Sequence, residues 1–200
     1  MTDPESWARK MARRKAVQDA KMAAATAEKG LLMVHTGNGK GKTTAALGLI
    51  LRAVGHGWPV GMVQFIKSGG RRPGELVALE RFADLVDCRV MGEGFTWETQ
   101  DRARDISAAQ AAWTTAQAMM AEPRYRLVVL DELTIVLRYR FLAVSDVVAG
   151  LTARRPDLHV VVTGRHAPPE LLGAADLITE AQAVKHPFQA GIKAQVGIEF

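Results

Sequence analysis

The segment with the clearest chemical signal is the glycine-rich stretch 36–44, Thr-Gly-Asn-Gly-Lys-Gly-Lys-Thr-Thr, which follows an apolar run and precedes a helix-forming one. Glycines at alternate positions let the backbone adopt positive φ and turn successive N–H groups toward an anion. A helix that opens at Lys42 or Thr43 adds its free N–H groups and the positive end of its dipole. Lys42 is placed to reach the β- and γ-phosphates, and the Thr43 hydroxyl to bind the accompanying Mg²⁺. The stretch predicts a phosphate-binding loop.

The loop departs from the usual G-x-x-x-x-G-K-[ST] pattern. Counting back from Gly41 places Thr36, not glycine, at the first position. A loop built on Gly37 is one residue shorter, so the depth and orientation of a bound triphosphate stay open. The alternative, a glycine-rich turn that binds nothing, is disfavoured because strand, loop and helix come in the order that the mechanism requires.

Charged residues follow two later apolar runs. Asp131 and Glu132 end the run Leu127–Leu130, where carboxylates would lie beside the metal ion of a bound nucleotide. We therefore expect one of them to have a role at Mg²⁺. Arg165 follows the run Leu158–Thr163 and is placed to reach a phosphate or the nucleotide, although a plain surface arginine fits the spacing nearly as well.

Two aromatic residues, Phe95 and Trp97, lie in a loop flanked by glycine. They either fill the core or form a platform for a planar ligand. The sequence signals no Ser-His-Asp arrangement and no base that would activate a phosphate acceptor. A co-substrate that brings its own nucleophile would explain this.

The elements that must position these residues alternate along the chain. Short, apolar, β-branched runs separated by helices imply an α/β fold, with a parallel sheet covered by helices on both faces. Ligands bind such sheets at the carboxyl ends of the strands, where the residues above fall. The tail, 176–200, is expected to be extended. We expect strands at 31–35, 60–66, 86–91, 127–130 and 158–163, and helices at 43–54, around 76–82, from an Asp101 cap to about 120, and at 147–153 after a Ser145 or Asp146 cap.

The 200 residues can form one core, which we place at residues 30–200, after a basic helical arm at residues 1–29. The arm carries seven of the Lys and Arg residues against four acids, and this accounts for most of the net charge of +5. It is either a solvated terminus or a segment that orders over the active site or on a partner subunit.

The cysteine content and the hydropathy pattern indicate the cellular compartment of the protein. Cys88 is the single cysteine, so no internal disulfide can form, and no Cys/His cluster has the spacing of zinc ligands. No apolar run approaches the roughly 18 residues of a membrane span, and no signal core is visible. We expect a cytoplasmic protein that binds neither membrane nor nucleic acid.

Several motifs together resemble the P-loop family of ATP:corrinoid adenosyltransferases, which includes the cob(I)yrinic acid a,c-diamide and cob(I)alamin enzymes. The matching blocks run in order from about Gly30 to Phe200 and are far more specific than the loop alone. They are residues 36–46, 53–57, 63–67, 94–97, 130–134, 163–165, 184–188 and 191–195.

The resemblance implies a RecA-like α/β fold, usually a homodimer, that transfers the 5′-deoxyadenosyl group of ATP to the cobalt of a reduced corrinoid and releases triphosphate. It also implies that ATP binds in the reverse of the ordinary orientation, that Mg²⁺ accompanies it, and that a flavoprotein reductase or other electron donor supplies cobalt(I). This reaction belongs to adenosylcobalamin biosynthesis or salvage.

The resemblance also assigns residues. It implies that Phe95 and Trp97 lie against the corrinoid and help to displace its lower axial ligand, and that the arm covers the corrinoid. Lys42 would stabilise charge on the leaving triphosphate. Glu132 matches the carboxylate linked to Mg²⁺, with Asp131 beside it, and Thr43 would also bind this ion. The ATP-binding residues would be Thr36, Gly37, Asn38, Gly39, Lys40, Gly41, Lys42, Thr43, Thr44, Arg52 and Arg165.

Two other functions are compatible with a phosphate loop. A nucleoside or small-molecule kinase would produce ADP and would need a base beside the acceptor hydroxyl. A nucleic-acid-stimulated ATPase would use the basic arm and would bind DNA or RNA in a salt-sensitive way. The aromatic loop and the carboxyl-terminal block favour the adenosyltransferase.

Overall fold

A computed structural model of the chain describes residues 3–66, 73–92 and 101–199. Its centre is a six-stranded parallel sheet with the strand order β3-β2-β4-β5-β1-β6. The strands are β1 (Leu32–Thr36), β2 (Val60–Gln64), β3 (Val86–Val90), β4 (Leu127–Asp131), β5 (His159–Thr163) and β6 (Leu177–Glu180).

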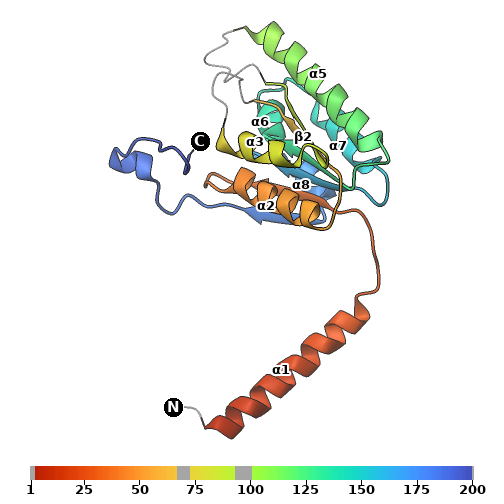
Figure 1. Cartoon of the computed structure of the whole chain (residues 1–200), viewed down its shortest axis with the longest axis vertical. Helices are drawn as coiled ribbons and strands as arrows, with labels where there is room; N and C mark the ends of the chain where they lie inside the picture. The colour runs from red at the N-terminus through yellow and green to blue at the C-terminus, as the bar shows by residue number, and fades with distance from the viewer. Residues whose placement is uncertain (1–2, 67–72, 93–100, 200) are drawn as a thin grey trace.

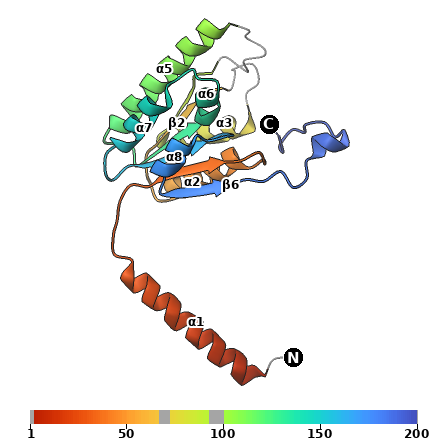
Figure 2. The ribbon, with the colours of Figure 1, turned by 180° about the vertical axis from the view of Figure 1, so that it is seen from behind.

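Helices cover both faces of this sheet (Figure 1 and Figure 2). One face packs against α2 (Lys42–Gly55) and α3 (Gly74–Leu79), which continues into the 3-10 turn η1 (Glu80–Phe82). The other face packs against α5 (Arg102–Ala121), α6 (Leu133–Arg138), α7 (Val144–Thr152) and α8 (Pro169–Ala174). The predicted α/β architecture, with a parallel sheet between two helical layers, is confirmed.

The apolar runs of the sequence become strands that are buried on both sides. In β1, Leu32 and Val34 point into the core under α5 to α8, whereas Met33 points into the core under α2 and α3. This alternation follows from the period of two along a strand, and it explains why the central strands are apolar at almost every position. Val34 lies opposite Val162 of β5 and Ile178 of β6.

The predicted arm contains one helix, α1 (Pro4–Ala24), which stands away from the sheet and its covering helices in Figure 1. The Asp3 carboxylate caps it by accepting from the backbone N–H groups of Glu5 and Ser6, and Pro4 takes the first helical position. No residue of α1 is buried. Among the described helices, none combines the length and the apolarity that crossing a membrane requires.

The structure corrects several local predictions and adds two short helices. The tail is not simply extended, because Leu177–Glu180 pairs with β1 as β6 and Pro187–Ala190 forms a 3-10 turn, η2. The second strand ends at Gln64 and not at Ile66. Helix α7 begins at Val144 after an Ala143 cap, so neither Ser145 nor Asp146 caps it. The short helices α6 and α8 were not predicted, since six residues are too few to show a helical period.

Candidate functional site

The glycine-rich stretch forms a tight loop between the end of β1 and the start of α2. Gly37 and Gly41 both have positive φ, 94° and 99°. Gly41 is the N-cap of this 14-residue helix, and among the described residues no N-cap side chain bonds to the first N–H groups of α2. Such a helix start attracts anions, because its free N–H groups and its dipole both present positive charge.

The loop packs tightly against the segment that follows β6. The backbone N–H of Gly39 donates to the Ala181 carbonyl at 2.7 Å, and the Ala181 N–H donates to the Thr36 carbonyl at 2.8 Å. A Cβ atom on Gly37 would lie 2.4 Å from the Ala181 carbonyl oxygen, and one on Gly39 would lie 2.6 Å from the Gln182 carbonyl oxygen. These two positions therefore need glycine for close approach.

Lys42 is held inside the loop that it follows. Its side chain is 8% exposed, and its ammonium group donates to the carbonyl oxygens of Gly37, at 2.9 Å, and Gly39. Burial lowers the pKa of Lys42 below its usual value, the nearby Arg165 lowers it further, and Glu132 raises it. The ammonium group is thus already desolvated at the point where phosphate oxygens would meet the loop.

Asp131 is the buried centre of the site. Its side chain is fully buried, and its Oδ1 atom accepts from the hydroxyls of Thr43 at 2.9 Å and Thr163 at 2.7 Å. Its Oδ2 atom accepts from the Gln64 amide at 3.0 Å. The carboxylate therefore connects the carboxyl ends of β2, β4 and β5 to the first turn of α2.

Glu132, the next residue, occupies a different environment. Its backbone is left-handed, with φ of 63°, a conformation that costs free energy in a residue other than glycine. Its N–H donates to the Thr163 hydroxyl at 3.0 Å, and its side chain lines the pocket beside the loop. The strained turn separates the roles of the two acids, because Asp131 stays in the core and Glu132 faces the pocket.

That pocket, of about 510 Å³, lies at the carboxyl ends of the strands, as predicted. Its cationic lining comes from Lys40, Lys42 and Arg165, and its carboxylates are Glu75, Glu132 and Glu199. The rest of the lining consists of Gly39, Gly41, Thr43, Thr44, Leu47, Gly74, Gly197 and Ile198. A hollow of about 800 Å³ beside the edge strand β3 shares no lining residue with this pocket.

The structure does not bring every predicted residue to the pocket. Thr36 is buried and its hydroxyl accepts from the Ala167 N–H at 3.2 Å, while Gly37 and Asn38 lie outside the lining. Arg52 is exposed in the last turn of α2, at the opposite end of that helix from Lys42. A nucleotide contact by Arg52 within one chain therefore has no support from the geometry. Phe95 and Trp97 lie outside the described residues.

Several residues of the site were missed from the sequence, Glu75 among them. Gln64 and Thr163 each end an apolar strand with a polar side chain, and this was the available signal for a site at that edge of the sheet. Gln64 lies directly opposite Asp131 in the pairing of β2 with β4. Glu199 reaches the pocket from a segment that sequence patterns described only as extended.

The family model described as "ATP:corrinoid adenosyltransferase BtuR/CobO/CobP" matches residues 28–200 of this chain. A corrinoid adenosyltransferase of Pseudomonas aeruginosa is 54% identical over 191 residues, covering 96% of this chain and 94% of that protein. A corrinoid adenosyltransferase of a Sinorhizobium species is 48% identical over 200 residues, covering 99% of this chain and 93% of that protein. The corrinoid adenosyltransferase CobA of Salmonella typhimurium is 48% identical over 182 residues, covering 91% of each chain.

Among solved structures, the flagellar accessory protein FlaH from Methanocaldococcus jannaschii is similar to this chain, with a TM-score of 0.48 and 10% sequence identity. The similarity covers 76% of this chain and 71% of that one.

Proposed function

This chain belongs to the ATP:corrinoid adenosyltransferase family, and we propose that its loop pocket holds ATP while the 5′-deoxyadenosyl group passes to the cobalt of a reduced corrinoid. The protein is thus an ATP:corrinoid adenosyltransferase of cobalamin biosynthesis, with a parallel α/β fold. The observation that carries the assignment of the site is the convergence of Lys42, Thr43 and Glu132 on one pocket at the carboxyl ends of the strands. The family match, and not the pocket alone, favours adenosyl transfer over a kinase or an ATPase.

The reaction needs a nucleophile, a leaving group and their alignment. Cobalt(I) of the substrate donates an electron pair to the 5′-carbon of ATP, forming a cobalt–carbon bond as the bond between that carbon and the α-phosphate oxygen breaks. The electron pair of the broken bond leaves with triphosphate, so no protein base is required. The protein has to hold the two reactants in line and stabilise the charge that develops on the leaving group.

Lys42 suits the second task. Its ammonium group is already desolvated and is held by two loop carbonyls, so little reorganisation is needed when phosphate oxygens replace them. The free N–H groups at the start of α2, together with Lys40 and Arg165, add positive charge around the same space. Thr44 lines the pocket from the first turn of α2.

The residues around Thr43 fit a magnesium ion. Thr43, Glu132 and Asp131 offer only oxygen atoms, which are the ligands that Mg²⁺ prefers, and Asp131 orients Thr43 through a hydrogen bond. We propose that Thr43 and Glu132 hold the ion with ATP and that Asp131 supports them from the core. Bound Mg²⁺ would neutralise part of the triphosphate charge.

The remaining assignments are also proposals. Phe95 and Trp97 would face the corrinoid, and an electron donor such as a flavoprotein reductase would supply cobalt(I). In the arm, residues 1–29, Trp7 is 55% exposed and Met22 is 61% exposed. We propose that these apolar side chains pack on the substrate or on the catalytic domain, residues 30–200, of a homodimer partner. We propose a cytoplasmic location.

The phosphate product tests the proposed chemistry. Wild-type protein is mixed anaerobically with Mg·ATP and chemically reduced cobalt(I) corrinoid, and the phosphates are identified by ³¹P NMR. Adenosyl transfer predicts intact triphosphate in a one-to-one ratio with the organocobalt product. Accumulation of ADP without a change in the corrinoid would contradict the proposal.

A further inference from the structure

The segment after β6, residues 181–199, begins and ends at the phosphate loop. At its start, Ala181 exchanges backbone hydrogen bonds with Thr36 and Gly39. At its other end, the Glu199 carboxylate forms an ion pair with the Lys40 ammonium group, across 159 positions of sequence. Figure 1 and Figure 2 both show the segment leaving β6, turning at η2 and coming back toward the loop. We call residues 182–199 the strap.

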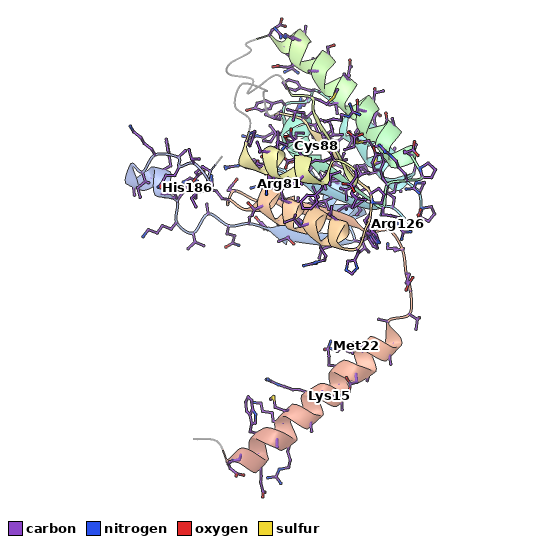
Figure 3. The ribbon with its side chains drawn as sticks, in the orientation of Figure 1. Lys15, Met22, Arg81, Cys88, Arg126 and His186 are labelled. Carbon is purple, nitrogen blue, oxygen red and sulfur yellow. The ribbon has the colours of Figure 1, made fainter. Side chains whose placement is uncertain are left out.

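Contacts along the middle of the strap are sparse. None of residues 182–199 is buried, and the apolar side chains of Val184, Phe188 and Val196 are 92%, 79% and 82% exposed. His186 lies at the outer bend, away from the sheet (Figure 3). Gly191 and Gly197 both have positive φ, and these turns bring the strap back on itself. A segment with so few packing contacts opens at a low free-energy cost.

The far end of the strap lines the pocket. Gly197, Ile198 and Glu199 share its lining with Lys40, Lys42 and Thr43. The Glu199 side chain is 16% exposed and that of Lys40 is 48% exposed, so solvent reaches the ion pair. Ion pairs of this kind contribute little stability, and a more highly charged anion can replace their carboxylate.

Glu199 differs from the other two carboxylates of the pocket in how it is anchored. Glu75 belongs to helix α3, and Glu132 follows the buried strand β4 directly. Both are fixed to elements that pack on the sheet, whereas Glu199 is carried by the strap. When a polyphosphate enters, repulsion between its negative charge and Glu199 is relieved by movement of the strap.

We infer that Glu199 is a specificity-determining residue. Its carboxylate binds the Lys40 ammonium group as an internal anion and must leave it when a polyphosphate binds. The inference rests on the proposed function of the pocket. A ligand that is too weakly charged to displace Glu199 binds without Lys40. After adenosyl transfer, the returning carboxylate competes with the triphosphate product and favours its release.

The test uses the full chain and inorganic tripolyphosphate with Mg²⁺. Calorimetric titration compares the wild type with Glu199→Gln, which keeps the size of the side chain and removes its charge. Loss of the competing anion should tighten binding roughly twofold to tenfold, in keeping with the strength of an exposed ion pair. Glu122→Gln is the matched control, because Glu122 is exposed at the end of α5 and does not line the pocket.

Limited trypsin digestion provides a second readout. Lys185 and Lys193 are exposed in the strap, and cleavage there should speed up when tripolyphosphate releases the wild-type strap. In Glu199→Gln the same sites should be cleaved quickly even without ligand.

Two results would overturn the inference and leave the phosphate loop assignment intact. One is that Glu199→Gln binds tripolyphosphate no more tightly than the wild type does. The other is that the ligand does not accelerate cleavage of the wild-type strap. Failure of the wild type and both variants to bind tripolyphosphate would overturn the proposed pocket as well.

Discussion

The Thr43 hydroxyl donates a 2.9 Å hydrogen bond to Oδ1 of Asp131, which ties the first turn of α2 to the end of β4. The same oxygen accepts from Thr163, and the other carboxylate oxygen accepts from Gln64. Because Asp131 is fully buried and receives these three donors, it fixes the position of Thr43 before a ligand arrives. Asp131 acts as a positioning residue, and Glu132 is the carboxylate that faces the pocket.

Replacing Asp131 with asparagine should destabilise the fold and weaken Mg·ATP binding. The asparagine N–H₂ group cannot accept the hydrogen bonds that one of the carboxylate oxygens now accepts, so a buried donor loses its partner. The expected loss in free energy of unfolding is about 1–3 kcal/mol. Urea denaturation measures it. Asp157→Asn is the control, since this carboxylate is 52% exposed and pairs only with Arg155 at 3.5 Å among the contacts described. Equal unfolding free energies for the two variants would contradict a structural role for the buried carboxylate.

The close approach at Gly39 predicts different outcomes for two glycine-to-alanine substitutions. Gly39→Ala places a Cβ atom 2.6 Å from the Gln182 carbonyl oxygen, so the loop or the strap must shift, at a cost of about 1–3 kcal/mol. Gly48→Ala, on the exposed face of α2 with no atom near the added Cβ, should stabilise the protein by roughly 0.5–1 kcal/mol. Thermal unfolding of both variants checks this. A stable Gly39→Ala protein that binds tripolyphosphate normally would refute the tight packing.

His159 should make stability depend on pH. Its Nδ1 atom accepts from the Leu31 N–H at 3.2 Å, and its ring stacks on Trp58 with centroids 5.7 Å apart. Burial, and then the nearby Arg126, lower the pKa of His159 below its ordinary 6.5. The unfolded chain therefore binds the proton more readily, so this contribution to stability is complete above pH 6.5 and is lost as pH falls through the folded-state pKa.

Urea unfolding midpoints across the range from neutral to acid pH measure this contribution. The difference between the wild type and His159→Asn should shrink as pH falls, because asparagine can accept the Leu31 hydrogen bond but does not titrate. A constant difference between wild type and His159→Asn at every pH would contradict the prediction.

The aromatic pair is predicted to act on the cobalt oxidation state. Phe95→Ala combined with Trp97→Ala should slow the reaction from cobalt(II) more than the reaction from chemically prepared cobalt(I). Removing the lower axial ligand makes cobalt(II) easier to reduce, and we propose that the pair performs this step. Anaerobic rates from the two starting states test it, and equal losses would mean that the pair only supports packing or binding.

Local patterns made part of this site predictable. The loop, Lys42 and the two acids follow directly from the order of strand, loop and helix in the sequence. The left-handed turn at Glu132 was not visible, because Asp131 and Glu132 look equivalent at the end of an apolar run. The family resemblance favours Glu132 as the Mg²⁺-linked carboxylate, and the turn and the burial of Asp131 give the structural difference between the two acids.

Long-range partners were beyond the sequence patterns. Gln64 meets Asp131 through the register of β2 on β4, and Glu199 meets Lys40 through the return of the strap. Neither contact leaves a periodic signal, since the partners are 67 and 159 positions apart. β6 was missed for a related reason, because each of its four residues is exposed at the sheet edge and its pairing with β1 decides its conformation.

The most direct test of the central claim is the anaerobic visible spectrum of a cobalt(I) corrinoid mixed with Mg·ATP and the wild type, Lys42→Ala or Arg81→Ala. Arg81 is an exposed cation of η1 that does not line the pocket, so the wild type and Arg81→Ala should both convert the cobalt(I) spectrum to that of a light-sensitive organocobalt product. Lys42→Ala should lose about 10²- to 10³-fold in turnover, as when one preorganised charge-stabilising group is removed. Near-normal turnover by Lys42→Ala, or an unchanged cobalt(I) spectrum with the wild type, would contradict the assignment of this pocket to adenosyl transfer.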